Sequence, residues 1–231
     1  FSMSWEQVYQ QWLNEENIPE NLKNELKDLN TDPEKCEDAF YAPLEFGTAG
    51  MRGILGAGIN RMNIFTVRQA TEGLARFMDT QDPETKRRGV AIAYDSRHMS
   101  PEFAMEAAKT LAKHDIPSFV FESLRPTPEL SFAVRYFKAF AGIMITASHN
   151  PAAYNGYKVY GEDGGQMPPA DADALTKYVR SIENPLKIDV LSDEEVAHSG
   201  LINIVGEEVD NAYLKEIKTV TINQELINEM G

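Results

Sequence analysis

The chain has 231 residues, of which 42% are hydrophobic, and its 22 Lys and Arg stand against 36 Asp and Glu, for a net charge of −14. This acidic balance argues against nucleic acid or an anionic membrane as the main partner, although a local arginine cluster can still bind a phosphorylated small molecule. The apolar content excludes a disordered chain. The single cysteine, Cys36, allows no internal disulfide, and no apolar run reaches membrane-spanning length, so we expect a cytoplasmic protein.

The first forty residues predict helices. Ser4 and Gln7 match a capping box, and apolar residues recur at helical spacing after it. We interpret residues 1–40 as a helical segment. Met3 would be a natural first residue and the final ELINEMG carries no closing signal, so we expect an N-terminal fragment of a longer protein.

A glycine-rich run follows in LEFGTAGMRGILGAGINRMN, residues 44–63, which holds five glycines together with Arg52 and Arg61. Glycine permits unusual backbone angles and a close approach of the backbone to a ligand. Two interpretations stay open from the residues alone: a strand with turns, or a phosphate-binding segment.

The middle of the chain alternates strands and helices, which indicates an α/β domain. We predict strands near 89–94, 117–121, 140–146 and 156–160, with helices at 64–78, 100–114 and 170–182. Ser100 is expected to cap its helix. Residues 183–205 read as a surface excursion with short strands, and 209–217 begins a helix that leads out of the domain.

The polar run TASHNPAAYNGYKVY, residues 146–160, directly follows the apolar AFAGIMI. Ser148 lacks the G-x-S-x-G elbow, and the adjacent His149 is awkwardly placed as a hydrolase base, so a serine-hydrolase triad is disfavoured. Ser148 could equally cap a turn. Asn155-Gly156 is a turn signal that would return Lys158 towards Ser148. There the Lys158 amine could move a proton or hold a phosphate. Alternatively, Lys158 is a solvated strand lysine without a functional role.

Two further inferences concern this region. A loop of nine residues, 147–155, is too short for a parallel crossover, so its flanking strands should be antiparallel. The four histidines show no metal-ligand spacing with one another or with Cys36.

Taken together, TASHNPAAYNGYKVY and the preceding strings FGTAGMRG, AYDSR and PTP resemble the N-terminal part of the α-D-phosphohexomutase family. GTAGMRG with GINRMN is most similar to its phosphoglucomutase and phosphopentomutase branch. The motifs cover about residues 40–160. The resemblance implies a three-layer α/β domain with a mixed, mainly four-stranded sheet between helices.

The resemblance also implies a reaction. Ser148 would be a phosphoserine that passes its phosphoryl group to a hexose 1-phosphate and regains one from the bisphosphorylated sugar, moving phosphate between C1 and C6 of glucose. Such an enzyme is an intramolecular phosphotransferase of the isomerase class. Mg²⁺ would bind the phosphoserine oxygen, and glucose 1,6-bisphosphate would act as activator.

Individual residues match family positions. Arg52 matches the arginine at the reacting phosphate, Lys158 the proposed general acid or base, and His149 the histidine that supports proton transfer or orientation. Asn150 would hold the loop shape and contribute to the phosphate site. Arg97 would neutralise phosphate or brace the loop, with Asp95 orienting it.

Other family parts are missing from the sequence. It has no D-G-D-x-D-R metal loop, so the metal ligands other than the Ser148 phosphate would lie outside this chain. We therefore expect a helical segment at 1–40, the phosphoserine domain at 41–206 and the start of a second domain at 207–231, with a phosphosugar and the remaining domains as partners. Phosphopentomutase, phosphomannomutase and a non-catalytic sugar-phosphate-binding domain remain as alternatives.

Overall fold

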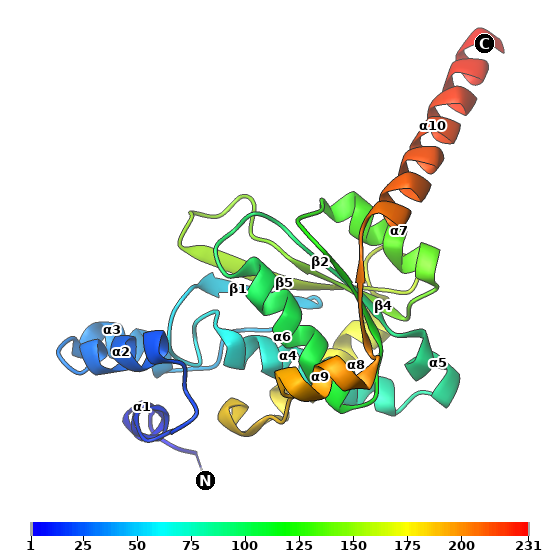
Figure 1. Ribbon diagram of the computed structural model, residues 1–231. Helices are drawn as coiled ribbons and strands as arrows, with labels where there is room; N and C mark the ends of the chain where they lie inside the picture. The colour runs from blue at the N-terminus through cyan, green and yellow to red at the C-terminus, as the bar shows by residue number, and fades with distance from the viewer. Residues whose placement is uncertain (1, 231) are drawn as a thin grey trace.

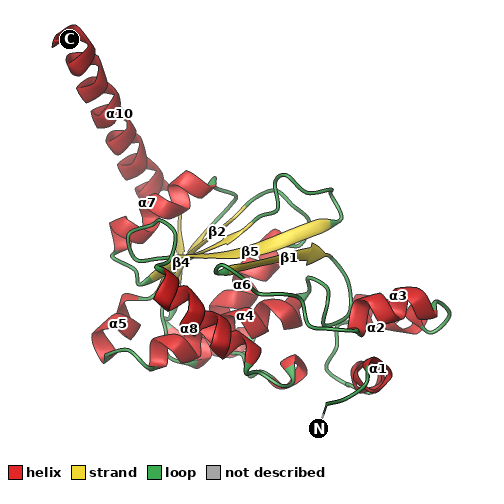
Figure 2. Ribbon diagram, turned by 180° about the vertical axis from the view of Figure 1, so that it is seen from behind, coloured by secondary structure: helices red, strands yellow, loops and turns green. Residues whose placement is uncertain are grey.

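The computed structural model describes residues 2–230, and Figures 1 and 2 show its helices, strands and loops. The strands are β1 Gly50–Ile54, β2 Val90–Tyr94, β3 Ser118–Phe121, β4 Ala141–Ile145, β5 Tyr154–Tyr160 and β6 Ile202–Val205. The helices are α1 Trp5–Leu13, α2 Glu20–Leu29, α3 Pro33–Phe40, α4 Ile64–Asp79, α5 Pro83–Arg88, α6 Ser100–Lys113, α7 Thr127–Phe137, α8 Pro169–Arg180, the 3-10 turn η1 Pro185–Lys187, α9 Asp193–Ser199 and α10 Glu207–Met230.

The strands form one mixed sheet in the order β1-β5-β4-β2-β3-β6. The pairs among β2, β3, β4 and β6 are parallel, whereas β5 pairs antiparallel with both β4 and β1. The predicted mixed sheet and the antiparallel strands around the serine loop are confirmed. The expected four main strands are β2 to β5, and the structure adds β1 and β6 at the edges, where half-exposed strands lack a continuous apolar run.

Helices cover both faces of the sheet, which confirms the three-layer α/β class. The larger core packs Leu74 of α4, Leu111 of α6 and Leu175 of α8 against Ile92 and Ile143 of the central strands. The opposite face holds α7 and the base of α10, whose buried Leu130 and Val209 belong to a second cluster with Met144 of β4. Figure 1 shows α4, α6 and α8 below the sheet and α7 on its other side.

The N-terminal helices α1 to α3 form a separate bundle beside the sheet (Figures 1 and 2). Its centre is Trp12, 1% exposed, which meets the rings of Phe40 and of Phe65 from α4 edge-on. The capping box of Ser4 and Gln7 is present. The described part of residues 1–40 therefore holds three helices, and Phe1 itself lies outside the described residues.

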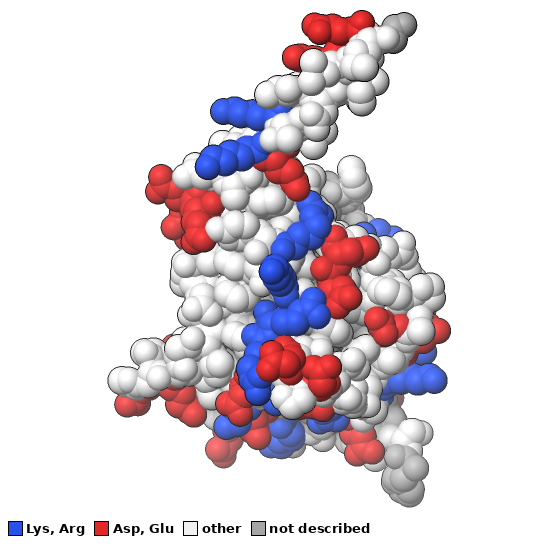
Figure 3. All heavy atoms as spheres, turned by 90° about the vertical axis from the view of Figure 1, so that its right-hand side faces the viewer, with Lys and Arg blue, Asp and Glu red and all other residues white. Residues whose placement is uncertain are grey.

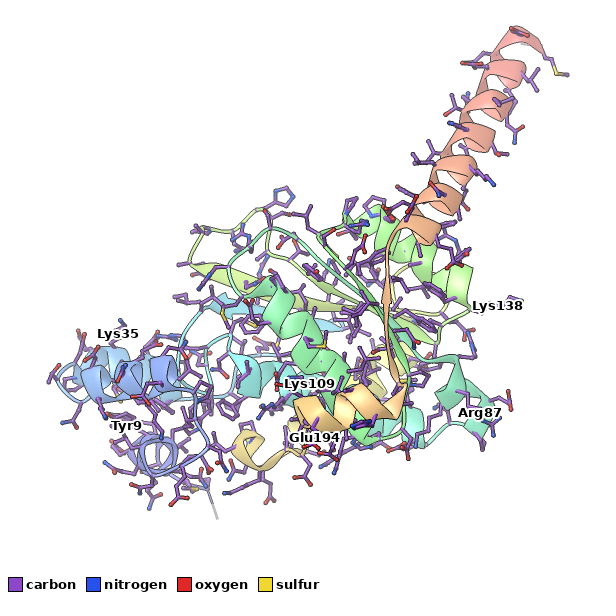
Figure 4. The ribbon with its side chains drawn as sticks, viewed as in Figure 1. Tyr9, Lys35, Arg87, Lys109, Lys138 and Glu194 are labelled. Atoms are coloured by element: carbon purple, nitrogen blue, oxygen red, sulfur yellow. The ribbon has the colours of Figure 1, made fainter. Side chains whose placement is uncertain are left out.

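Two helix starts differ from the prediction. Ser100 is the first helical residue of α6 rather than its cap, because Met99 precedes it in a left-handed conformation. In the stretch expected to hold only short strands, α9 begins at a capping box of Ser192 and Glu195. Figure 4 shows Lys109 of α6 close to this helix, and its Nζ lies 2.6 Å from Asp193 Oδ1. The S-x-x-E pattern at 192–195 is the signal that identifies α9.

The last helix, α10, projects away from the body in both ribbon views. Every residue from Leu214 to Met230 is exposed. Across residues 2–230, no helix combines the length and apolar character needed to cross a membrane.

Candidate active site

The serine loop, residues 146–153, connects β4 to β5. The preceding strand β4 is buried at every position, so the chain leaves the core at Thr146 and exposes Ser148 and His149. The backbone N–H of Asn150 donates to Ala147 O at 2.8 Å, which turns the chain around these two residues. The two candidate side chains are thus presented by a short loop anchored on a rigid strand.

Neighbouring strands bring two cationic side chains to the same face of the sheet. In β1 and β5, Arg52 pairs with Gly156 and Gly50 pairs with Lys158. Paired residues of antiparallel strands point to the same face, so Arg52 and Lys158 lie diagonally across from each other. Both are exposed, while Asn155, Tyr157 and Val159, which point to the other face of β5, are buried.

These residues border one cavity of about 770 Å³. Arg52, Ser148, His149, Asn150 and Lys158 all line it, so the structure brings together five of the six predicted site residues. The other lining residues are Glu45, Gly47, Thr48, Gly50, Met51, Thr146, Ala147, Val159, Tyr160 and Gln166. Two cationic side chains beside a serine suit an anionic ligand such as a phosphate group.

Arg97, the sixth predicted residue, is absent from the lining and holds the serine loop from behind. Its guanidinium donates to the carbonyl oxygen of Pro151 at 2.7 Å, of Tyr154 at 3.1 Å and of Asn150 at 2.6 Å. These contacts support the bracing role rather than the phosphate role, which stays a prediction.

A second set of hydrogen bonds ties both ends of the serine loop to the loop after β2. Asp95 accepts from the Thr146 hydroxyl at 2.7 Å, from the Ser100 hydroxyl at 3.1 Å and from the backbone N–H of Arg97 at 3.0 Å. The buried Asn155 donates to Ser100 Oγ at 2.9 Å. Asp95 therefore orients the chain at Arg97, as expected, and fixes the start of the serine loop as well.

The predicted turn at Asn155-Gly156 is wrong, because both residues lie within β5. Gly156 is needed for close approach instead: a Cβ there would lie 2.6 Å from Thr146 O and 3.3 Å from Arg52 Cβ. The chain reverses earlier, where Tyr154 N–H donates to Pro151 O. The predicted consequence still holds, since Lys158 and Ser148 line the same cavity.

The glycine-rich run contributes a strained turn to the cavity wall. Gly47 and Gly50 exchange backbone hydrogen bonds of 3.0 and 3.1 Å, and between them Thr48 and Ala49 both have positive φ, 50° and 59°. Two left-handed central residues define a type I′ turn, which normally selects Asn or Gly. Strain of this kind persists where the surroundings impose it, often at functional sites.

Glu45, Thr48 and Gln166 are among the cavity residues that sequence reasoning missed. Glu45 directly precedes the FGTAG string and Thr48 lies within it, so the string itself was the available signal, whereas nothing near Gln166 marked it. Arg61, from the same glycine-rich run, lies elsewhere: it is 7% exposed and its guanidinium lies 2.6 Å from Asp38 Oδ2. Its role is structural.

Beneath the cavity, Tyr157 of β5 is fully buried and its hydroxyl lies 2.9 Å from Thr71 Oγ1 of α4. Burial raises the pKa of Tyr157, and the hydrogen bond with Thr71 opposes that rise only in part. Burial also raises the pKa of Tyr160, which lines the cavity. Both phenols therefore stay neutral.

The donors available for a metal are few. Within residues 2–230, no three His, Cys, Asp or Glu side chains gather in a metal-binding group. The cavity wall holds one carboxylate, Glu45, beside two cations. These residues do not fit a complete Mg²⁺ site, because Mg²⁺ requires several oxygen ligands in octahedral geometry.

Comparisons with known proteins identify the family of this chain. Residues 43–186 match the model of the phosphoglucomutase/phosphomannomutase family, alpha/beta/alpha domain I. A protein named phosphoglucomutase from Staphylococcus saprophyticus is 41% identical over 209 residues, which are 90% of this chain and 37% of the relative. A second protein named phosphoglucomutase, from Staphylococcus epidermidis, is 44% identical over 189 residues, which are 82% of this chain and 34% of the relative.

Among solved structures, a candidate phosphomannomutase from Thermus thermophilus is similar, with a TM-score of 0.62 and 29% identity over 77% of this chain and 36% of that one. This chain thus spans little more than a third of the relatives that it matches. The chain belongs to the phosphoglucomutase/phosphomannomutase family and corresponds to its α/β/α domain I.

Proposed function

We propose that this chain is the phosphoserine-bearing part of a phosphoglucomutase, with Ser148 as the phosphoryl carrier. The observation that carries the proposal is the cavity in which Ser148 lies with Arg52 and Lys158. Phosphoryl transfer depends on positioning and charge neutralisation more than on a strong base. A serine beside two cations, without a hydrolase triad, suits that demand.

In the forward reaction, the phosphorus–oxygen bond of phosphorylated Ser148 breaks as the C6 hydroxyl of glucose 1-phosphate forms a new one. The C6 hydroxyl loses its proton and Ser148 Oγ gains one, and Lys158 would move protons at Ser148 Oγ. The bisphosphorylated sugar then turns over and returns its C1 phosphate to Ser148. Arg52 neutralises the charge of the transferred group, and His149 orients it or assists the proton transfer.

Mg²⁺ belongs to this proposal as the ion that the Ser148 phosphate would bind. Because the described residues form no complete magnesium site, its other ligands would come from another part of the enzyme. Glucose 1,6-bisphosphate would activate the enzyme by phosphorylating Ser148. Asn150 would keep the loop in shape and contact phosphate.

The proposal extends to domain organisation. We place a helical segment at 1–40, the phosphoserine domain at 41–206 and the start of a second domain at 207–231, within a cytoplasmic enzyme that has further domains. The names of the relatives favour glucose over the pentose and mannose alternatives. A non-catalytic binding domain would not require Ser148, Arg52 and Lys158 in one cavity.

The test compares wild type, Ser148→Ala and Ser181→Ala in the complete enzyme, with Mg²⁺ and a trace of glucose 1,6-bisphosphate. Ser181 is an exposed serine at the end of α8 and is a matched control. We expect fast conversion of glucose 1-phosphate that Ser148→Ala abolishes and Ser181→Ala retains. Preference for ribose 1-phosphate or mannose 1-phosphate would change the assigned substrate and leave the mechanism in place. Turnover of the sugar phosphate by Ser148→Ala would overturn the mechanism. The 231-residue chain alone should not catalyse repeated conversion of glucose 1-phosphate.

A further inference from the structure

The base of α10 is attached to α7 by a small set of contacts. Val209 is fully buried, and the ring of Tyr213 lies 5.4 Å from that of Phe132. The Tyr136 hydroxyl donates to Glu208, and Arg135 lies 3.4 Å from Glu216 in an exposed pair. Beyond these turns the helix is exposed, so its direction depends on its first three turns.

The tightest contact at this base is between Arg125 and Asp210. Arg125 Nε and Nη2 each donate to an Asp210 carboxylate oxygen at 2.8 Å. Nη1 of Arg125 donates to the Ser123 hydroxyl and to the carbonyl oxygens of Ser123 and Leu124. The guanidinium also lies over the Phe121 ring, 5.3 Å from its centre. The donors of Arg125 are therefore committed while it holds α10.

Glu129, in the first turn of α7, competes for the same guanidinium. It is 6% exposed, and its Oε2, which lies 3.7 Å from Arg125 Nε, has no hydrogen-bond partner among the described residues. A buried carboxylate without a partner is costly. It can gain a proton and donate a hydrogen bond to Asp210, or it can draw Arg125 away from Asp210. Burial, together with the contact to Asp210, raises the pKa of Glu129 to about 7.

Within residues 2–230, Arg125 is the one cation that forms an ion pair with Glu129. Glu122, before α7, lies 3.7 Å from Arg125 Nη2 and adds negative charge. From β2, Tyr94 contributes a phenol whose pKa burial raises, and its carbonyl accepts from the Arg125 backbone. From α10, Asp210 has its pKa lowered by the hydrogen bond from Arg125. Ionised Glu129 thus adds a second carboxylate to an arginine that Asp210 already occupies.

We propose that Glu129, Arg125 and Asp210 form a proton-sensitive latch that sets the direction of α10 relative to the sheet. With Glu129 neutral, its proton bridges to Asp210 and Arg125 holds α10. With Glu129 ionised, Arg125 is shared between two carboxylates and the base of α10 loosens. Any segment that α10 leads to would then change orientation with pH. This latch is independent of the proposed reaction.

Förster transfer between dyes on the 231-residue chain tests the latch. The dyes are attached at Lys113→Cys on α6 and Glu225→Cys on α10, both exposed, with the buried Cys36 replaced by Ala. In the range from about pH 5.5 to about pH 8.5, we expect the distance distribution to broaden with a midpoint near the Glu129 pKa of about 7. A distribution that does not change with pH would overturn the proposal, and this comparison needs no change at Glu129.

Three variants sharpen the result. Glu129→Gln keeps a neutral donor towards Asp210, so its inter-dye distance distribution should stay narrow at every pH. In Asp210→Asn the distribution should be broad at every pH. Arg135→Gln removes the exposed pair with Glu216 on the same two helices and should leave the midpoint unchanged. A pH response that persists in Glu129→Gln would contradict the assignment. Figure 3 shows acidic and basic side chains interspersed up to the base of α10. Because salt screens interactions between such exposed charges, ionic strength is held constant across the pH series.

Discussion

Lys158 lies directly opposite Gly50 in the antiparallel pair of β5 and β1, and a Cβ on Gly50 would lie 3.2 Å from Lys158 Cγ. On the same face, Arg52 lies opposite Gly156. Each long cationic side chain of the cavity is thus accommodated by a glycine on the neighbouring strand. Gly50 of the glycine-rich run and Gly156 of β5 therefore make room for the two cations.

The first prediction is that Gly50→Ala displaces Lys158 while the fold remains intact. A methyl group at this distance forces the lysine stem to shift by a few tenths of an ångström or more. Small misplacements of a reacting group are costly, so kcat of the complete enzyme should fall by roughly 10- to 100-fold. The free energy of unfolding should fall by only about 1 kcal/mol.

Gly53→Ala is the matched control because Gly53 lies on the other face of β1. Its Cβ would meet Leu44 Cδ1 at 2.8 Å, away from the cavity. We expect this variant to lose stability and keep kcat. Steady-state kinetics and thermal unfolding of both variants check the prediction, and equal loss of kcat in the two would refute it.

The second prediction concerns Arg97. In Arg97→Lys, one ammonium group cannot reach the three carbonyl oxygens that the guanidinium holds, so the serine loop loosens. We expect kcat to fall by roughly 10- to 100-fold with little change in KM, because the reacting serine and not the sugar site is displaced.

Arg88→Lys serves as its control. Arg88 also donates to two backbone carbonyl oxygens, those of Lys138 and Ala139, but it lies outside the cavity lining. Arg88→Lys should lower the free energy of unfolding and leave kcat unchanged. If both variants keep full kcat at saturating substrate, Arg97 does not position the loop.

The third prediction is a pH dependence of stability from His114. Its ring nitrogens lie 2.7 Å from Glu72 Oε1 and from Asp79 Oδ2, joining the end of α6 to α4. The hydrogen bond with Glu72, reinforced by Asp79, raises the pKa of His114. Burial opposes ionisation of Glu72 and Asp79, but hydrogen bonds, including those from His114, lower both pKa values.

The direction of the effect follows from these shifts. The stabilisation from His114 is fully present below its unfolded pKa of about 6.5 and is lost as pH rises through the higher folded value. The stabilisation from the two carboxylates is present above roughly pH 4.5 and is lost as pH falls through their lowered values. His114→Gln should therefore cost about 1 kcal/mol near pH 6 and less near pH 9. Urea unfolding at both pH values measures this, and a cost that does not decline with pH would contradict it.

The sequence predicted best what depends on local patterns. The buried strands VAIAY (β2) and AGIMI (β4) are continuous apolar runs, and their predicted bounds agree to about one residue. The site residues near Ser148 were identified from the motif TASHNPAAYNGYKVY, and the structure places them in one cavity.

Long-range contacts decided the rest. The left-handed Thr48 and Ala49 could not be predicted, since neither residue favours that conformation and the surrounding sheet imposes it. The bracing by Arg97 depends on carbonyl groups more than fifty residues away in sequence. Asn155-Gly156 reads as a turn locally, yet the pairing of β5 with β1 and β4 extends it into a strand.

The measurement that tests the central claim most directly is the mass of Ser148 peptides from the complete enzyme after reaction with glucose 1,6-bisphosphate. We expect one phosphoryl group on Ser148, whose isotope label passes to the sugar when glucose 1-phosphate is added while Ser148 regains an unlabelled phosphoryl group, and no labelling in Ser148→Ala. Turnover of glucose 1-phosphate with Ser148 unmodified throughout, or a phosphoryl group carried by another residue, would contradict it.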